Sequence, residues 1–142
     1  MPTRKAEAEW EGNLAEGGGR LKVGSGAFEG PYSFKSRFEE GEAATNPEEL
    51  LGAAHAGCFT MALTAALSRA SIKPKRIHTE ARVKLEKVGE AFAITQIELE
   101  TEAEIPDIDD AAFQRYAQGA KENCPLSKAL ASTPITMTAK LV

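Results

Sequence analysis

Alternating apolar and polar residues near the start of the chain predict β-strands. Between residues 6 and 10, two alanines and a tryptophan alternate with charged residues, which is the period of a half-buried strand. Residues 21–23 begin a second such pattern, and residues 32–38 give a third, whose aromatic side chains share one face. A glycine cluster at 17–19 predicts the turn between the first two strands. We therefore expect three consecutive antiparallel strands.

A long uncharged segment follows and has the features of a helix. Asn46 is a suitable N-cap, Pro47 suits the first helical position and Glu49 the third. The segment from residue 50 to residue 68 contains no aspartate, glutamate, lysine or arginine. We predict a helix that runs from residue 47 to about residue 70.

This uncharged segment is long enough to cross a lipid bilayer in principle. It is nevertheless rich in alanine and glycine, contains His55, and has neither aromatic belts nor an asymmetry of basic flanks. A helix that is apolar on every face in a soluble protein is a buried helix. Because one small protomer cannot easily cover such a helix on all sides, we expect an obligate homodimer with two of these helices near its centre.

The second half of the chain predicts a hairpin, a helix and a closing strand. Residues 77–85 and 92–99 alternate on either side of a turn at 88–90, and a phase slip near residues 95–96 predicts a β-bulge. The further predicted elements are a helix after Pro106 that ends at 123–125, a short helix at 126–130, and a strand at 135–141. The predicted class is α+β: an N-terminal three-stranded antiparallel sheet, a long buried central helix, and a second antiparallel sheet with a second helix and a C-terminal strand.

Size and charge narrow the possible functions. The 142 residues predict a single domain spanning 1–142. A formal net charge of −4 disfavours nucleic acid and anionic membranes as partners, because both attract basic surfaces. Residues 1–7 lack an apolar stretch behind their charges, so no secretory signal is expected and the predicted location is cytoplasmic.

The two cysteines of the chain lie in different surroundings. Cys58 lies deep in the uncharged helix, where an apolar molecule could approach it away from water. Cys124 lies 66 residues later, where Pro125 breaks a helix. Because disulfides in the cytoplasm are more often transient and catalytic than structural, this pairing suggests one cysteine that reacts and another that resolves the product.

A reactive Cys58 needs a positive charge nearby. Only a few per cent of an unperturbed thiol is ionised at neutral pH. Cys58 is twelve residues beyond Asn46, and the helix dipole acts only over the first turn. His55 is three residues away, although a core histidine satisfied by a backbone carbonyl is its more ordinary role. Of the seven arginines, Arg37 is favoured by its position alone.

The two cysteine motifs together resemble a known family. The segments 46–59 and 123–130, with 32–34 and 37–38, look like the OsmC/Ohr family of thiol-dependent hydroperoxide reductases, closest to its OsmC branch. The resemblance covers essentially the whole chain. It implies that Cys58 is the peroxidatic thiol and Cys124 the resolving thiol, and that Arg37 and Glu49 activate Cys58. It further implies an intertwined homodimer that exchanges its N-terminal strands, with two active sites at the interface, no bound cofactor and an external dithiol reductant.

The spacing of Glu49 and Cys58 adds an independent point. On one helix, nine residues correspond to a rotation of about 180° and a rise of roughly 13 Å. If Glu49 acts on a Cys58 thiolate, it must therefore belong to the other protomer, where it would hold an arginine by a paired fork. A capping carboxylate is its alternative role, and the two are compatible.

The expected reaction reduces a hydroperoxide at Cys58. Arg37 would polarise the O–O bond, the sulfenic acid would condense with Cys124, and a dithiol would restore both thiols. An apolar entry formed by Phe38, Phe59 and Met61 would favour alkyl hydroperoxides over hydrogen peroxide, although ordinary core packing explains each of these residues as well.

Three other functions stay open at this point. The first is thioester or acyl hydrolysis by Cys58 with His55 as base, which also needs an oxyanion hole. The second is a metal-binding module built from Cys58, His55, Cys124 and His78, whose spacing matches no closed zinc pattern. The third is a non-catalytic dimer whose thiols sense oxidants.

Overall fold

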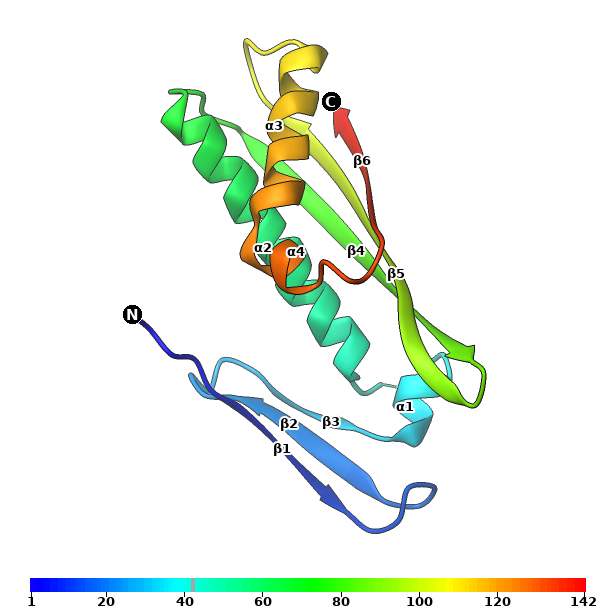
Figure 1. The fold of residues 1–142 in the computed structure, drawn as a ribbon. Coiled ribbons are helices and arrows are strands. Elements are labelled where there is room, and N and C mark those ends of the chain that lie inside the picture. The colour runs from blue at the N-terminus through cyan, green and yellow to red at the C-terminus, as the bar shows by residue number, and fades with distance from the viewer. Residues whose placement is uncertain (42) are drawn as a thin grey trace. The chain divides into compact units, whose positions relative to one another are not determined.

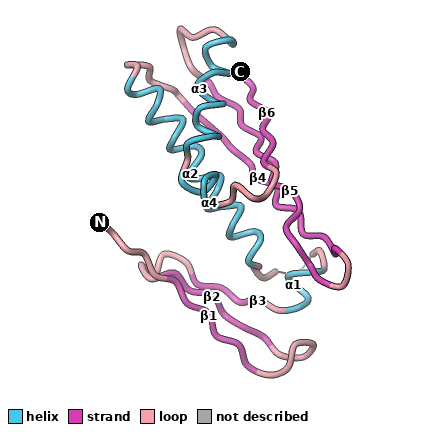
Figure 2. Tube along the Cα trace, in the orientation of Figure 1, coloured by secondary structure: helices cyan, strands magenta, loops and turns pink. Residues whose placement is uncertain are grey.

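The computed structural model describes residues 1–41 and 43–142 and has an α+β fold with two three-stranded sheets (Figure 1). The described chain divides into two compact units, Met1–Leu50 and Leu51–Val142. The first unit holds strands β1 to β3 and the short helix α1, and the second holds the other sheet with the helices on it (Figure 2). The expectation of one domain over the whole chain stays a prediction.

The first unit contains the three consecutive antiparallel strands that the sequence predicts. They are β1 (Ala6–Glu11), β2 (Gly18–Val23) and β3 (Glu29–Tyr32), paired in the order β1-β2-β3. Gly18 and Gly19, expected in a turn, instead begin β2. A side chain at Gly19 would lie 2.5 Å from the Tyr32 ring and 2.7 Å from the Glu9 carbonyl, so glycine is needed there for strand packing. The turn precedes them, with Gly12 at a φ of 89°.

The prediction of the third strand at residues 32–38 is wrong in its position, because β3 covers Glu29–Tyr32 and shares only Tyr32 with it. Residues Phe34–Phe38 instead form helix α1. The cause is a capping box: the Ser33 hydroxyl accepts from the Ser36 N–H at 3.0 Å, while the Ser36 hydroxyl accepts from the Ser33 N–H at 2.8 Å. This local bonding overrides the alternation and places Arg37 on a helix.

The predicted central helix is present as α2 (Pro47–Arg69). Its start is fixed by Asn46, whose side-chain oxygen accepts from the Glu49 N–H at 2.7 Å. Of the described helices, α2 is the one long and apolar enough to span a membrane. Phe59, Leu63 and Leu67 on this helix are fully buried in the core. These residues form the side of α2 that packs into the core of the second unit.

The sheet of the second unit begins with the predicted hairpin of β4 (Arg76–Val88) and β5 (Ala91–Glu104). The predicted bulge is confirmed, because Lys84 pairs with Gln96 and Leu85 with Ile94, which leaves Thr95 as the extra residue. The last strand, β6 (Ile135–Leu141), pairs with β5 in parallel, so the complete sheet is mixed.

Two helices join β5 to β6. Helix α3 (Asp110–Asn123) begins at Asp109, whose side chain accepts from the Ala112 N–H at 2.8 Å, and α4 (Pro125–Ala129) follows after Cys124. Figure 1 shows α2 and α3 on the same side of this sheet. The core between these helices and the sheet contains Phe59, Leu63, Leu67, Ile97, Leu99, Ala103, Phe113 and Ala117.

One side of α2 is exposed in the described chain. Ala54, Gly57, Met61 and Ala65 recur at helical spacing along it, and Met61 is 77% exposed. The helix therefore has a buried side and a small-residue, apolar side that the described chain leaves open to solvent.

Candidate active site

Cys58 and Cys124, the two predicted site cysteines, meet in the second unit. Cys58 lies on α2 and is half-buried, whereas Cys124 is fully buried between α3 and α4. Both are free thiols, and side-chain hydrogen bonding between them contributes to the pKa of Cys58. The half-buried Cys58 thiol thus has the buried Cys124 thiol as its neighbour, which is the arrangement needed to form a disulfide after oxidation.

The position of Cys124 follows from its role at two helix ends. Its backbone N–H donates to the Ala120 carbonyl and closes α3, and its sulfur accepts from the Ser127 N–H at 3.3 Å at the start of α4. Pro125 takes the first position of α4, where its missing N–H costs nothing. These bonds fix the sulfur at the point where the chain turns between the two helices.

The surroundings of Cys58 shift its pKa in opposite directions. Burial is the largest influence and raises the pKa, a hydrogen bond from the Leu126 N–H lowers it, and the neighbouring Cys124 raises it. The net effect is a raised pKa. Within the second unit, then, the thiol form of Cys58 is favoured, and a thiolate at this position requires a further positive charge.

The hydrogen-bond partner of His55 is Ser127 rather than Cys58, the residue that it would need to deprotonate in the hydrolase alternative. Its Nε2 lies 2.8 Å from the Ser127 hydroxyl, and that hydroxyl lies 3.1 Å from the Cys124 sulfur. His55 is fully buried, and its Nδ1 has no hydrogen-bond partner among the described residues. Burial lowers the pKa of His55, so the ring is held in its neutral form.

Arg37, the predicted activating cation, belongs to the first unit and is held by a carboxylate. Its Nε and Nη2 both donate to Oε1 of Glu48, at 2.9 Å and 2.7 Å. Glu48 is buried, and its Oε2 has no hydrogen-bond partner among the described residues. The Arg37 guanidinium also lies over the Phe38 ring, 5.6 Å from its centroid.

Glu49, the predicted partner of an arginine, bonds instead to residues just before α2. Its N–H donates to Asn46, and its carboxylate accepts from the Thr45 hydroxyl at 2.9 Å. The recorded contact with Arg37 is made by the adjacent Glu48. Sequence reasoning missed Glu48 because either carboxylate of the Pro47-Glu48-Glu49 start could face the arginine, and only the rotation of α2 distinguishes them.

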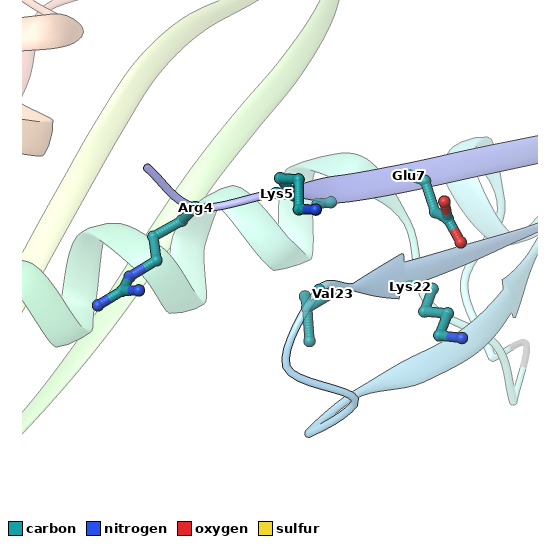
Figure 3. A pocket seen from close by; sticks show the side chains of 7 residues that line it. Arg4, Lys5, Glu7, Lys22 and Val23 are labelled. Atoms are coloured by element: carbon teal, nitrogen blue, oxygen red, sulfur yellow. The ribbon is translucent and has the colours of Figure 1, made fainter. Parts of the chain in front are cut away.

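Hollows in the first unit are open and shallow. One of about 430 Å³ is lined by residues that include Arg37, Asn46 and Glu49. Another, of about 580 Å³, lies where β1 begins and β2 ends, and Figure 3 shows that Arg4, Lys5, Glu7 and Lys22 around it point in different directions. No three His, Cys, Asp or Glu residues gather as a metal site in residues 1–41 and 43–142.

Comparisons with known proteins agree with this architecture. The family model described as OsmC-like protein matches residues 39–140. Peroxiredoxin OsmC of Escherichia coli (strain K12) is 48% identical over 128 residues, which are 89% of each chain. An organic hydroperoxide resistance protein of Xanthomonas axonopodis pv. citri is 30% identical over 90 residues, or 63% of this chain and 61% of that protein.

Solved structures show the same fold. The structure of an organic hydroperoxide resistance protein from Elizabethkingia anophelis matches with a TM-score of 0.75 at 25% identity. The match covers 99% of this chain and 96% of that chain. Together with the family match over most of the chain and the relative at 48% identity, this similarity establishes that the chain belongs to the OsmC family.

Proposed function

We propose that this chain is a thiol-dependent peroxidase that reduces organic hydroperoxides to alcohols, and hydrogen peroxide less well, in defence against oxidative stress. The observation that carries the proposal is the half-buried Cys58 thiol with the fully buried Cys124 thiol as its neighbour. Membership of a family that includes a peroxiredoxin and organic hydroperoxide resistance proteins supports the same enzyme class.

The first step is attack by the Cys58 thiolate on a hydroperoxide oxygen. The S–O bond forms as the O–O bond breaks, and the departing alkoxide takes up a proton to leave as the alcohol. Arg37 is the proposed cation for this step, because a guanidinium stays charged and can bond both a thiolate and a peroxide oxygen. Glu48 positions that guanidinium through its two recorded hydrogen bonds.

The second step converts the sulfenic acid of Cys58 into a disulfide with Cys124. A small dithiol or a dithiol protein then exchanges with the disulfide and restores both thiols. The cycle uses no bound cofactor or metal, since the electrons come from the external dithiol.

Activity requires a homodimer in this proposal, with Arg37 and the α2 carboxylates of one protomer serving Cys58 of the other. The exposed apolar side of α2, with Met61 at its middle, supports a partner helix at that place. The exchange of N-terminal strands and a cytoplasmic location belong to the same proposal.

The proposal is tested by steady-state turnover of an organic hydroperoxide and of hydrogen peroxide with several dithiols. We expect turnover that favours the organic substrate and is lost in Cys58→Ser. A single round of disulfide formation that never turns over with excess dithiol would instead identify a redox sensor. Thioester hydrolysis that is unaffected by Cys124→Ser would identify an acyl hydrolase, although the bonding of His55 to Ser127 gives that reaction no support.

A further inference from the structure

A chain of buried polar groups ends on the resolving cysteine. It runs from His55 Nε2 to the Ser127 hydroxyl at 2.8 Å and from that hydroxyl to the Cys124 sulfur at 3.1 Å. All three residues are buried, and they come from α2, α4 and the turn between α3 and α4. The proposed peroxidatic step at Cys58 does not use His55 or Ser127, so this network needs another explanation.

We propose that Ser127 and His55 form a proton relay that deprotonates Cys124 for its attack on the sulfenic acid of Cys58. This inference rests on the proposed peroxidase function and deepens it, since it assigns residues to the resolving step. His55 and Ser127 act through Cys124 and are positioning residues rather than groups that contact the peroxide.

The distances permit a proton to move along the network. Either atom of each pair can donate at these distances. The relay uses the arrangement in which the Cys124 S–H donates to the Ser127 oxygen and the Ser127 O–H donates to Nε2 of neutral His55. When both protons shift, Nε2 gains one, and the Ser127 hydroxyl and the Ser127 N–H then both donate to a Cys124 thiolate. The Ser127 hydroxyl and N–H are thus both placed to bond the sulfur when it attacks.

The state of His55 suits a base. Burial lowers the pKa of His55, so the resting ring is neutral and has one nitrogen lone pair free to accept a proton. Its Nδ1 has no partner among the described residues, so the relay ends at this ring.

Other titratable groups near the network are few. Cys58 is one, and it adjoins Cys124 directly. The inward-facing residues of the sheet are apolar or threonine, namely Ile77, Thr79, Ala81, Val83, Ile97, Leu99, Thr101 and Ala103. Helix α3 contributes the partly buried Tyr116 to the core, and Lys128 of α4 is exposed. No carboxylate is therefore available from these described faces to take the proton instead of His55.

The step balances in atoms and electrons. The Cys124 sulfur donates an electron pair to form the S–S bond, the S–O bond of the Cys58 sulfenic acid breaks, and hydroxide leaves and takes up a proton from solvent as water. Cys124 is oxidised and the sulfenic sulfur is reduced. The proton taken from Cys124 offsets the one that the leaving hydroxide takes up, so His55 is neutral again in the disulfide state. When the external dithiol reopens the disulfide, the Cys124 thiolate that leaves takes up one proton.

The test separates the two chemical steps in the full-length protein. Ser127→Ala and His55→Gln each interrupt the relay, while Thr101→Val removes a different buried hydroxyl that contacts Thr79 and the His78 carbonyl. Cys58 oxidation by an organic hydroperoxide is followed by dimedone trapping, and disulfide formation by quenched-flow alkylation. Thermal unfolding checks that each variant is folded, and Ser127→Thr restores the hydroxyl if the site itself has been disturbed.

We expect Cys58 oxidation to keep its rate in all variants. Disulfide formation should fall by about 10²-fold in Ser127→Ala and His55→Gln, which is the low end of what a positioned base contributes, and the sulfenic acid should accumulate. Disulfide formation should keep the wild-type rate in Thr101→Val and should return toward that rate in Ser127→Thr. Raising the pH toward ordinary thiol ionisation should restore disulfide formation in Ser127→Ala, because the thiol then ionises unaided.

The outcomes that overturn the relay differ from those that overturn the peroxidase. Equal rates of disulfide formation in the wild type and both relay variants would exclude the relay. The relay would also be excluded if disulfide formation were slowed to the same extent in Thr101→Val and if high pH did not restore it. Failure of the wild-type protein to form a Cys58 sulfenic acid at all would instead contradict the proposed function.

Discussion

Arg37 donates two hydrogen bonds to a single oxygen of Glu48, from Nε at 2.9 Å and from Nη2 at 2.7 Å. The side chain of Glu48 is only 9% exposed, whereas that of Arg37 is 42% exposed. The carboxylate is thus the fixed member of the pair, and the guanidinium keeps donors available on its exposed side. A guanidinium that is anchored but not enclosed is suited to binding a negatively charged group brought to it.

Glu48→Gln should lower kcat/KM for an organic hydroperoxide by about tenfold or more, since Arg37 would lose the charge that orients it and a preorganised donor of this kind contributes about 10²–10³ in rate. The measurement is the rate of Cys58 oxidation in a stopped-flow experiment, which avoids the resolving and reductive steps.

Glu49→Gln is the matched control for Glu48→Gln. It changes the neighbouring carboxylate, whose recorded partners are Thr45 and Asn46 rather than an arginine. We expect a smaller effect on the oxidation rate and a modest loss of thermal stability. If Glu49→Gln were the more damaging of the two substitutions in the oxidation rate, Glu48 would not be the residue that positions Arg37.

Met61→Glu should dissociate the proposed homodimer. Met61 is 77% exposed at the centre of the apolar side of α2, and burying an unpaired carboxylate against a partner helix is strongly unfavourable. Sedimentation velocity should show a dimer for the wild type and a shift toward monomer for the variant. Val88→Glu, at an exposed apolar residue of the β4–β5 hairpin, serves as the control and should leave the dimer intact. A monomeric wild type would contradict the interface.

His55 should make stability depend on pH. Burial lowers the pKa of His55 in the folded state, so the unfolded chain binds this proton first as the pH falls. Its contribution is therefore complete above the unfolded pKa of about 6.5 and is lost as the pH falls below that value toward and through the lower folded pKa. Urea unfolding at a series of pH values should show this loss in the wild type and a weaker one in His55→Gln. His78→Gln, at an exposed histidine, should behave like the wild type; identical pH profiles for all three proteins would rule the effect out.

Mixing two inactive variants tests whether the site is shared between protomers. Arg37→Ala and Cys58→Ser homodimers should each be strongly impaired in hydroperoxide turnover. If Arg37 of one protomer serves Cys58 of the other, a mixed dimer has one pocket with both native residues, and activity recovers in part. If both residues of a site come from the same chain, mixing leaves both pockets defective and no activity returns.

Much of the fold follows from periodicity and capping. The long helix at 47–69 follows from Asn46-Pro47 and the uncharged run behind it, and the extra residue Thr95 follows from a break in alternation. The helix at residues 34–38 could not be predicted from local pattern. Two serines three residues apart are a weaker signal in the sequence than an alternation of aromatic residues, although their capping box determines the structure. The parallel pairing of β6 with β5 depends on where the α3–α4 connection returns the chain, which local patterns do not encode.

The candidate site, like the fold, could be predicted from the sequence only in part. The two cysteine motifs identified Cys58 and Cys124, because each combines a thiol with a distinctive local context. Glu48 and Ser127 carried no such signal. A glutamate in the first turn of a helix and a serine after proline are common for capping reasons alone, and the contacts with Arg37 and His55 span 11 and 72 residues of sequence.

The most direct test of the central claim is the intact mass of the reduced protein after one equivalent of an organic hydroperoxide. The account predicts that the wild type loses two hydrogen atoms per chain through a Cys58–Cys124 disulfide, and that Cys124→Ser instead gains one oxygen atom at Cys58. Cys58→Ser should stay unmodified over the same time. Two results would contradict Cys58 as the residue that reduces the peroxide. One is a wild type that stays unmodified, and the other is Cys58→Ser that gains oxygen at Cys124 as fast as the wild type forms its disulfide.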